Sequence, residues 1–342
     1  MRKLSLVAIF VCLSNASLID DAKDAGLVAI PNNPAELEEL IKQSSPDYEK
    51  YPSTKERIEL GKKLYFDPRI SKSAIISCNT CHNLALGGVD GISASTGHKW
   101  TPNPHHLNAP TVLNSVFNQA QFWDGRAGHL QDQAKGPIQS EAEMAAVPSD
   151  VVKKITSIPA YVEEFKQAYG KNVKIDFDLI ATSIGIFERT LVTPSRFDDF
   201  LNGDEKALSK DEKAGLKLFI DKGCTSCHNG INLGGSLAAF GVMSNYTYEN
   251  VGDFKGNEDG LVKAPTLRNV ELTAPYYHNG VIWTLDEAVK TMGKIQLGIK
   301  ITNKESDLII KFLKSLTGRM PEIVYPVLPP SSENTQKPIL DY

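Results

Sequence analysis

Two short motifs, each with two cysteines and a histidine, constrain this chain more than any other feature. Two cysteines three residues apart can form thioethers with the two vinyl groups of one haem, and a histidine that follows at once lies under the iron as proximal ligand. The sequence therefore predicts two covalently attached c-type haems. The six residues are Cys78, Cys81, His82, Cys224, Cys227 and His228.

Three other interpretations of the cysteine pairs are less well supported. One zinc site with four cysteines usually has about 15 to 20 residues between its pairs, and these pairs are much farther apart. A thioredoxin-like redox pair would need a βαβ context, which neither pair has. Local disulfides remain an alternative, but the histidine after each pair favours haem. The fifth cysteine, Cys12, falls in the segment discussed next.

The N-terminus has the pattern of a secretory signal peptide. Arg2 and Lys3 precede an apolar stretch over residues 4–13, and small residues follow up to Ala16. This stretch is too short to span a membrane, so we predict a signal over residues 1–16 and export to the periplasm. The alternative is a buried N-terminal helix, but the acidic, polar residues 20–24 argue against it. No other stretch approaches the length of a membrane span.

Length and charge restrict the organisation and the partners. The 342 residues favour two domains, and the formal net charge of −4 argues against nucleic acid or an anionic membrane as a partner. We predict a signal over 1–16, an N-terminal cytochrome c-like domain over 17–190 and a C-terminal one over 191–342. Strand signals are sparse, so the predicted fold is mainly α, with long loops and little β structure.

Helix signals repeat around the two motifs. A capping box precedes each motif, with Ser53 and Ser209 as expected N-caps, and a third begins at Thr302. Apolar residues at helical spacing follow each motif at a distance, and we predict them to be core positions. The first stripe should end before Pro194 and the second before Gly318. The stripes are Ile180, Ile184, Phe187 and Leu191, and Leu308, Phe312, Leu313 and Leu316.

A haem iron either takes a sixth ligand or leaves that position open for chemistry. Spacing alone does not choose among the histidines and methionines that remain, and a lone one is more often structural. The candidates are His98, His105, His106, His129, His278, Met144, Met243, Met292 and Met320.

Long stretches of the chain resemble the bacterial dihaem cytochrome c peroxidases, from about Pro31 to Pro330. The matching segments lie around both haem motifs and in the loops and helices that follow them. They are residues 77–88, 108–114, 121–127, 133–137, 222–235, 264–269, 272–278 and 292–298. The resemblance implies a peroxidase that reduces hydrogen peroxide to water.

The resemblance also implies that the two haems have different roles. The C-terminal haem, with His228 below and Met292 above, would be the electron-transfer haem, because a thioether ligand raises the reduction potential. The N-terminal haem, with His82 as proximal ligand, would be the peroxidatic one. His98 matches the histidine that covers its distal face in the oxidised resting form and must leave before peroxide binds.

Further site residues are carried over from the same family. Glu143 matches the carboxylate that relays a proton between the peroxide oxygens; its neighbour Glu141 is expected to be a solvated loop charge. Gln133 matches a supporting polar residue, and Trp123 matches the tryptophan between the haems, although a core aromatic is an equally good interpretation from sequence. The family also binds one calcium ion, for which the matching ligands are Asn108, Thr273 and Pro275.

One segment departs from the family pattern. Residues 99–107 are longer and richer in proline and histidine, and this loop would have to move when His98 leaves. His105 and His106 could compete as ligands, although solvated positions are more common.

The resemblance implies a small cytochrome c or cupredoxin as electron donor, and a homodimer. One alternative is a dihaem electron carrier without catalysis. Another is a relative that oxidises tryptophans of a partner protein; such members have tyrosine where Met292 stands, which argues against it.

Overall fold

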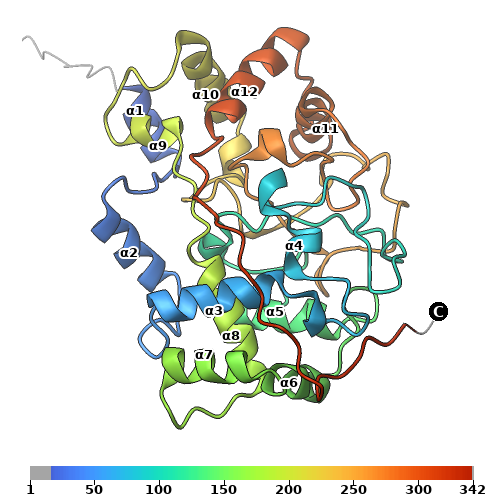
Figure 1. The fold of residues 1–342 in the computed structure, drawn as a ribbon. Coiled ribbons are helices and arrows are strands. Elements are labelled where there is room, and N and C mark those ends of the chain that lie inside the picture. The colour runs from blue at the N-terminus through green and yellow to red at the C-terminus, as the bar shows by residue number, and fades with distance from the viewer. Residues whose placement is uncertain (1–16, 341–342) are drawn as a thin grey trace, which may run out of the picture.

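The computed structural model describes residues 17–340, and the predicted signal over 1–16 lies outside them. As predicted, these residues form a mainly helical fold with long loops and one antiparallel pair of short strands (Figure 1). None of the helices described here is long and apolar enough to cross a membrane. The helices are α1 (Leu18–Asp24), α2 (Pro34–Gln43), α3 (Lys55–Phe66), α4 (Cys78–Cys81), α5 (Leu130–Gln139), α6 (Pro148–Thr156), α7 (Pro159–Tyr169), α8 (Phe177–Glu188), α9 (Arg196–Leu201), α10 (Lys210–Asp221), α11 (Leu285–Leu297) and α12 (Asn303–Ser315), and the strands are β1 (Leu237–Ala239) and β2 (Leu261–Lys263).

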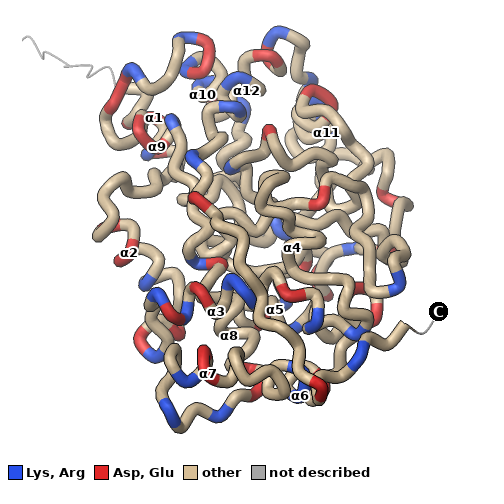
Figure 2. The backbone as a smooth tube through the Cα atoms, viewed as in Figure 1, with Lys and Arg blue, Asp and Glu red and all other residues tan. Residues whose placement is uncertain are grey.

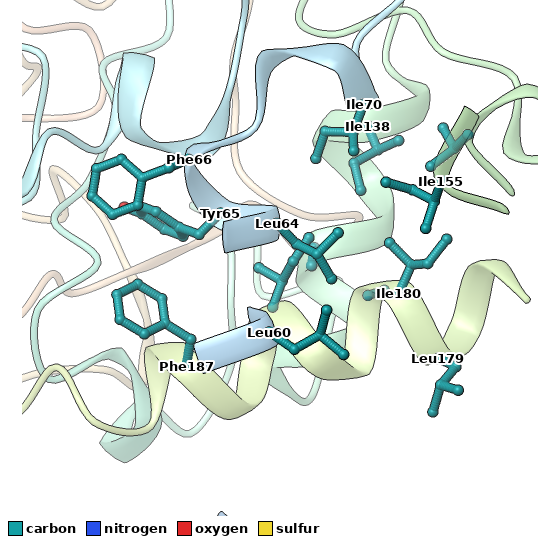
Figure 3. Packing of buried hydrophobic residues seen from close by; sticks show 14 of the residues in the cluster. Leu60, Leu64, Tyr65, Phe66, Ile70, Ile138, Ile155, Leu179, Ile180 and Phe187 are labelled. Carbon is teal, nitrogen blue, oxygen red and sulfur yellow. The ribbon is translucent and has the colours of Figure 1, made fainter. Parts of the chain in front are cut away.

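The core of the N-terminal half forms where α3 crosses α8. Leu60 and Leu64 of α3 and Ile180 and Phe187 of α8 are almost completely buried in this cluster (Figure 3). The helices can approach closely because α3 has a glycine at the crossing, Gly61. A Cβ atom there would lie 1.9 Å from the carbonyl oxygen of Ser183. Helices α5, α6 and α7 complete this core.

The C-terminal half repeats this crossing with α10 and α12. Leu216, Phe219 and Phe312 are buried between the helices. Gly215 occupies the crossing point, where a Cβ atom would lie 2.0 Å from the carbonyl oxygen of Leu308. The two crossings therefore have the same construction, as expected for two cytochrome c-like units.

Both ends of the described chain cross to the opposite half. Ala22 and Leu27 belong to the core of the C-terminal half, and α1 lies beside α9 and α10 (Figure 1). The C-terminal segment runs back over α3 towards α6, and the ring of Tyr325 contacts that of Phe66 at 4.7 Å between centroids. The boundary between residues 190 and 191 stays a prediction for the main body, whereas residues 18–29 pack with the C-terminal half.

Two of the three predicted capping boxes are confirmed. Ser209 caps α10 together with Glu212, and Thr302 caps α12 together with Glu305. The prediction for α3 was wrong by one residue, because the hydroxyl of Thr54, not of Ser53, accepts the bond from the Arg57 amide. Threonine and serine are both good N-caps, so the sequence alone did not distinguish the two positions.

The first apolar stripe ends earlier than predicted. Helix α8 stops at Glu188, with Arg189 as C-cap, so Leu191 lies outside the helix although it is fully buried in the same core. In the view of Figure 2, Lys and Arg are interspersed with Asp and Glu along the peripheral helices.

Candidate haem sites and active site

Each cysteine motif forms one tight turn that places its two thiols on the same side. Cys78 and Cys81 are the first and last residues of the single turn α4, and Cys224 begins a 3-10 turn that Cys227 follows. All four thiols are free and partly buried. A separation of three residues in a helical turn brings side chains together, which is the arrangement needed to attach one haem through two thioethers.

The histidine after each motif is held through the same ring nitrogen. Nδ1 of His82 lies 2.9 Å from the carbonyl oxygen of Pro110, and Nδ1 of His228 lies 3.1 Å from that of Leu233. A carbonyl partner puts the proton on Nδ1 and leaves Nε2 free to bind a metal. Burial lowers the pKa of both histidines, which favours the neutral ligand form. Tyr65 adds a hydrogen bond of 2.6 Å to the His82 carbonyl.

A large cavity lies next to the second motif. Its empty volume is about 1590 Å³, including the space at its open mouth. Cys224, Cys227 and His228 line the cavity together with Met292 of α11, and most of the remaining wall is apolar. A mostly apolar cavity with few polar groups is typical of cofactor sites. The residues present therefore fit a haem held by two thioethers, with His228 and Met292 available to its iron.

The predicted distal residues of the first haem meet beside α4. The amide of His98 donates to the carbonyl oxygen of Glu143 at 2.6 Å, and His98 is buried. The Cys81 thiol lies 3.9 Å from the carbonyl oxygen of Thr96, in the same loop as His98. Burial raises the pKa of Glu143, against the opposing charges of Arg126 and His105. Glu141 is exposed, as predicted.

Gln133 lies on α5, half-buried, one helix before the loop that carries Glu143. His105 points elsewhere: its Nδ1 lies 2.9 Å from a carboxylate oxygen of Asp253, in the C-terminal half. The backbone of His106 is left-handed, with a φ of 51°, and its Nδ1 is buried without a hydrogen-bond partner among residues 17–340. The loop with His98 is thus connected to both halves of the molecule.

Trp123 and the predicted calcium ligands lie together at the junction of the halves. The Trp123 indole donates to the carbonyl oxygen of Asn108 at 2.8 Å. The Asn108 side-chain amide lies 2.7 Å from the carbonyl oxygen of Pro275, and Thr273 lines the same cavity. The two ends of an amide are alike in shape, so a flip would turn the Asn108 oxygen towards the same point as Pro275. Only in that flipped orientation would Asn108 offer a calcium ion an oxygen beside Pro275, because as a donor its amide is satisfied by the Pro275 and Tyr277 carbonyls.

Residues 17–340 contain no cluster of three or more histidine, cysteine or acidic side chains that could hold a metal ion. The calcium proposal therefore depends on carbonyl and amide oxygens alone.

The junction contains a repeat that the sequence analysis missed. Asn108 begins the sequence Asn-Ala-Pro-Thr, and Lys263 begins Lys-Ala-Pro-Thr. The backbone amide of Asn108 donates to the carbonyl oxygen of His278 at 2.8 Å, and the backbone amide of Lys263 donates to that of Trp123 at 2.7 Å. Trp123 and His278 occupy corresponding places. Each lies between an aromatic residue with a left-handed backbone conformation and a glycine. The repeated Ala-Pro-Thr was the available signal.

The same correspondence between the halves extends to α5 and α11, the helices that follow these loops. Bridges between Gln121 and Ala127 and between Tyr276 and Ile282 form the loops that lead into α5 and α11. When these loops are matched, Met292 of α11 corresponds to Pro137 of α5. Proline has no side chain that can bind iron. The helix thus supplies a ligand candidate to the C-terminal site and none to the N-terminal site at this position.

Two helical halves, each with a paired-cysteine motif and a Nδ1-bonded histidine, define a c-type cytochrome with two haems. A family model described as Di-haem cytochrome c peroxidase matches residues 55–206, and one described as Cytochrome c matches residues 212–317.

The cytochrome c551 peroxidase of Pseudomonas aeruginosa is 48% identical over 300 residues, which cover 84% of this chain and 86% of that protein. That of Nitrosomonas europaea is 49% identical over 294 residues, covering 84% and 87%. The crystal structure of a MauG-like protein associated with microbial copper homeostasis is similar, with a TM-score of 0.69 and 26% identity over 79% of this chain and 91% of that chain. The chain belongs to the di-haem cytochrome c peroxidase family and is an oxidoreductase of that family.

Proposed function

We propose that this enzyme reduces hydrogen peroxide at its N-terminal haem, with electrons that enter at the C-terminal haem. The balanced reaction takes up one peroxide, two electrons and two protons and releases two waters. The observation that carries the proposal is the inequality of the two distal sides. Met292 lines the C-terminal cavity, whereas Pro137 stands at the matching position of the N-terminal half, where Glu143 and His98 lie instead.

A haem held by Cys78, Cys81 and His82 would supply the iron at which peroxide is reduced. The role of the chain there is to move a proton. Breaking the O–O bond requires a proton on the departing oxygen, and a carboxylate within reach of both oxygens can relay it. Glu143 is suited to this because burial raises its pKa above the ordinary value of a glutamate, which favours a carboxyl that can carry a proton. Gln133 would support the bound peroxide.

His98 would act as a removable cover. Its backbone is hydrogen-bonded to Glu143, so displacement of the His98 loop would also reposition the catalytic carboxylate. The loop is joined to the C-terminal half through His105 and Asp253. Through this contact, a structural change in the C-terminal half would be transmitted to the His98 loop.

Trp123 would carry electrons across the junction, supported by its burial and by its hydrogen bond to Asn108. Asn108, Thr273 and Pro275 would hold one calcium ion there. A small cytochrome c or cupredoxin is the proposed donor. We further propose a periplasmic location and a homodimer, on the basis of family resemblance.

The test is turnover of Glu143→Gln, with Glu141→Gln as the control on the exposed neighbour. In the peroxidase, steady-state oxidation of reduced cytochrome c by peroxide should fall at least about 100-fold in Glu143→Gln, because general acid–base catalysis typically contributes that much. Glu141→Gln should keep the normal rate. A wild-type protein, pre-reduced by one electron, that shows no peroxide-dependent turnover would instead indicate an electron carrier without catalysis.

A further inference from the structure

Lys263 is a buried cation without an anionic partner. Only 3% of its surface is exposed, and it lies at the end of β2 in the wall of the large cavity. No ion pair or side-chain hydrogen bond within residues 17–340 involves its ammonium group. Lys154 is equally buried, but its ammonium donates to the carbonyl oxygen of Ser71 at 2.7 Å. A buried charge is costly unless it is paired, so Lys263 requires an explanation that Lys154 does not.

The repeat at the junction shows what is unusual about this position. Asn108, the counterpart of Lys263, is neutral, and its side chain is satisfied by the carbonyl oxygens of Pro275 and Tyr277. Lys263 is tied to the other half in the matching way, through its amide and the Trp123 carbonyl. Its side chain, however, adds a positive charge that the N-terminal counterpart lacks.

The electrostatic surroundings of Lys263 point to the haems. Burial lowers the pKa of Lys263 to about 8, and Asp124 opposes this only in part. Lys263 also lines the same cavity as Cys224, Cys227 and His228, where a bound haem would bring its carboxylates.

We propose that Lys263 is the cationic partner of a haem propionate at the junction between the two halves. Each haem brings two carboxylates into the protein, and a carboxylate is the anion that a lone buried ammonium needs. The pair would lie beside Trp123, on the proposed route of electrons. This inference rests on the proposed haem attachment and is independent of peroxidase turnover.

The test measures the reduction potentials of both haems in the holoprotein, by redox titration followed optically and by electron paramagnetic resonance. Lys263→Met removes the charge and keeps a long, unbranched side chain. The lost positive charge favours the oxidised iron, so the oxidised-to-reduced ratio of the paired haem at a fixed potential should rise about tenfold. Its reduction potential should therefore fall by about 59 mV, the value for a tenfold change in a one-electron couple. Lys263→Arg should stay near the wild-type value. Lys294→Met, an exposed lysine on α11, is the matched control.

The haem whose potential falls identifies the propionate that is paired. If neither potential moves further in Lys263→Met than in Lys294→Met, or if Lys263→Arg shifts as much as Lys263→Met, the proposal is wrong. Should Lys263→Met fail to assemble with two haems, Lys263→Gln is titrated in its place. The propionate bending band in resonance Raman spectra gives a second readout, which should shift in the neutral variants and not in Lys263→Arg.

Discussion

The N-terminal and C-terminal halves are built on the same frame and filled with different chemistry. In both, a glycine lets two helices cross at close range, and a phenylalanine lies beside it: Gly61 with Phe187, and Gly215 with Phe312. The residue after that phenylalanine differs. It is Glu188 in the N-terminal half, beside Cys78, and Leu313 in the C-terminal half, where it lines the haem cavity. Backbone contacts are thus repeated, while a few wall residues make the halves unequal.

Three differences between the walls of the two halves would change the stability of a reduced haem in the same direction. The C-terminal half has Met292 where the N-terminal half has Pro137, and leucine where it has Glu188. Its lysine at 263 replaces a neutral asparagine. A thioether ligand, an apolar wall and a nearby positive charge would each favour the reduced state of the haem that they face, which suits the proposed electron-transfer role. The N-terminal half instead gathers carboxyl groups, which suit proton-dependent chemistry.

The largest effect should come from breaking the shared frame. In Gly61→Ala or Gly215→Ala, the new methyl group would meet a carbonyl oxygen at about 2 Å, and backbone cannot give way cheaply. We expect each to lower the free energy of unfolding by about 3 kcal/mol, the upper part of the range for overpacking. Denaturant titration of the holoprotein measures this. Gly128→Ala, where nothing lies within 4 Å, is the control and should be neutral; equal losses at all three positions would refute a repeated close crossing.

An intermediate effect should distinguish Glu188 from Leu313. Burial raises the pKa of Glu188 from an ordinary value of 4.5 to about 8. The folded state therefore holds this proton more tightly than the unfolded state, so stability is greatest at low pH and falls as pH rises from about 4.5 to 8.

Glu188→Leu should abolish this fall and make the protein more stable than wild type at pH 8, by a few kcal/mol. Thermal unfolding at pH 5 and pH 8 measures it, with Glu141→Leu on the surface as control. Parallel pH profiles for wild type and Glu188→Leu would show that the carboxyl is ionised or paired.

The smallest effect should come from the caps of the two repeated helices. Ser209 belongs to a reciprocal capping box, since its amide also donates to Glu212 at 2.7 Å, whereas Thr54 makes only a single long bond of 3.4 Å to the Arg57 amide. Ser209→Ala should cost about 1 kcal/mol and Thr54→Ala about 0.5 kcal/mol. Chemical unfolding at one pH resolves the two, and a larger loss in Thr54→Ala would reverse this ranking.

What the sequence determined by itself was local. The spacing of Cys78, Cys81 and His82, repeated in the second half, predicted both haem sites because attachment depends on residues within one turn. Caps and apolar periodicity predicted α10 and α12 for the same reason, and placed the start of α3 within one residue. The inequality of the two sites came from family resemblance, and the roles of His98, Glu143 and Met292 remain proposals.

What only the tertiary structure decided depends on segments far apart in the chain. Residues 18–29 pack with the C-terminal half, and His105 binds Asp253 across the junction. Neither Lys263 nor Glu188 was singled out by the sequence analysis. Burial is set by the sum of contacts from all neighbouring elements, so no local pattern reveals it. These buried charges, and not the haem motifs, are where the structure added most to the comparison of the two halves.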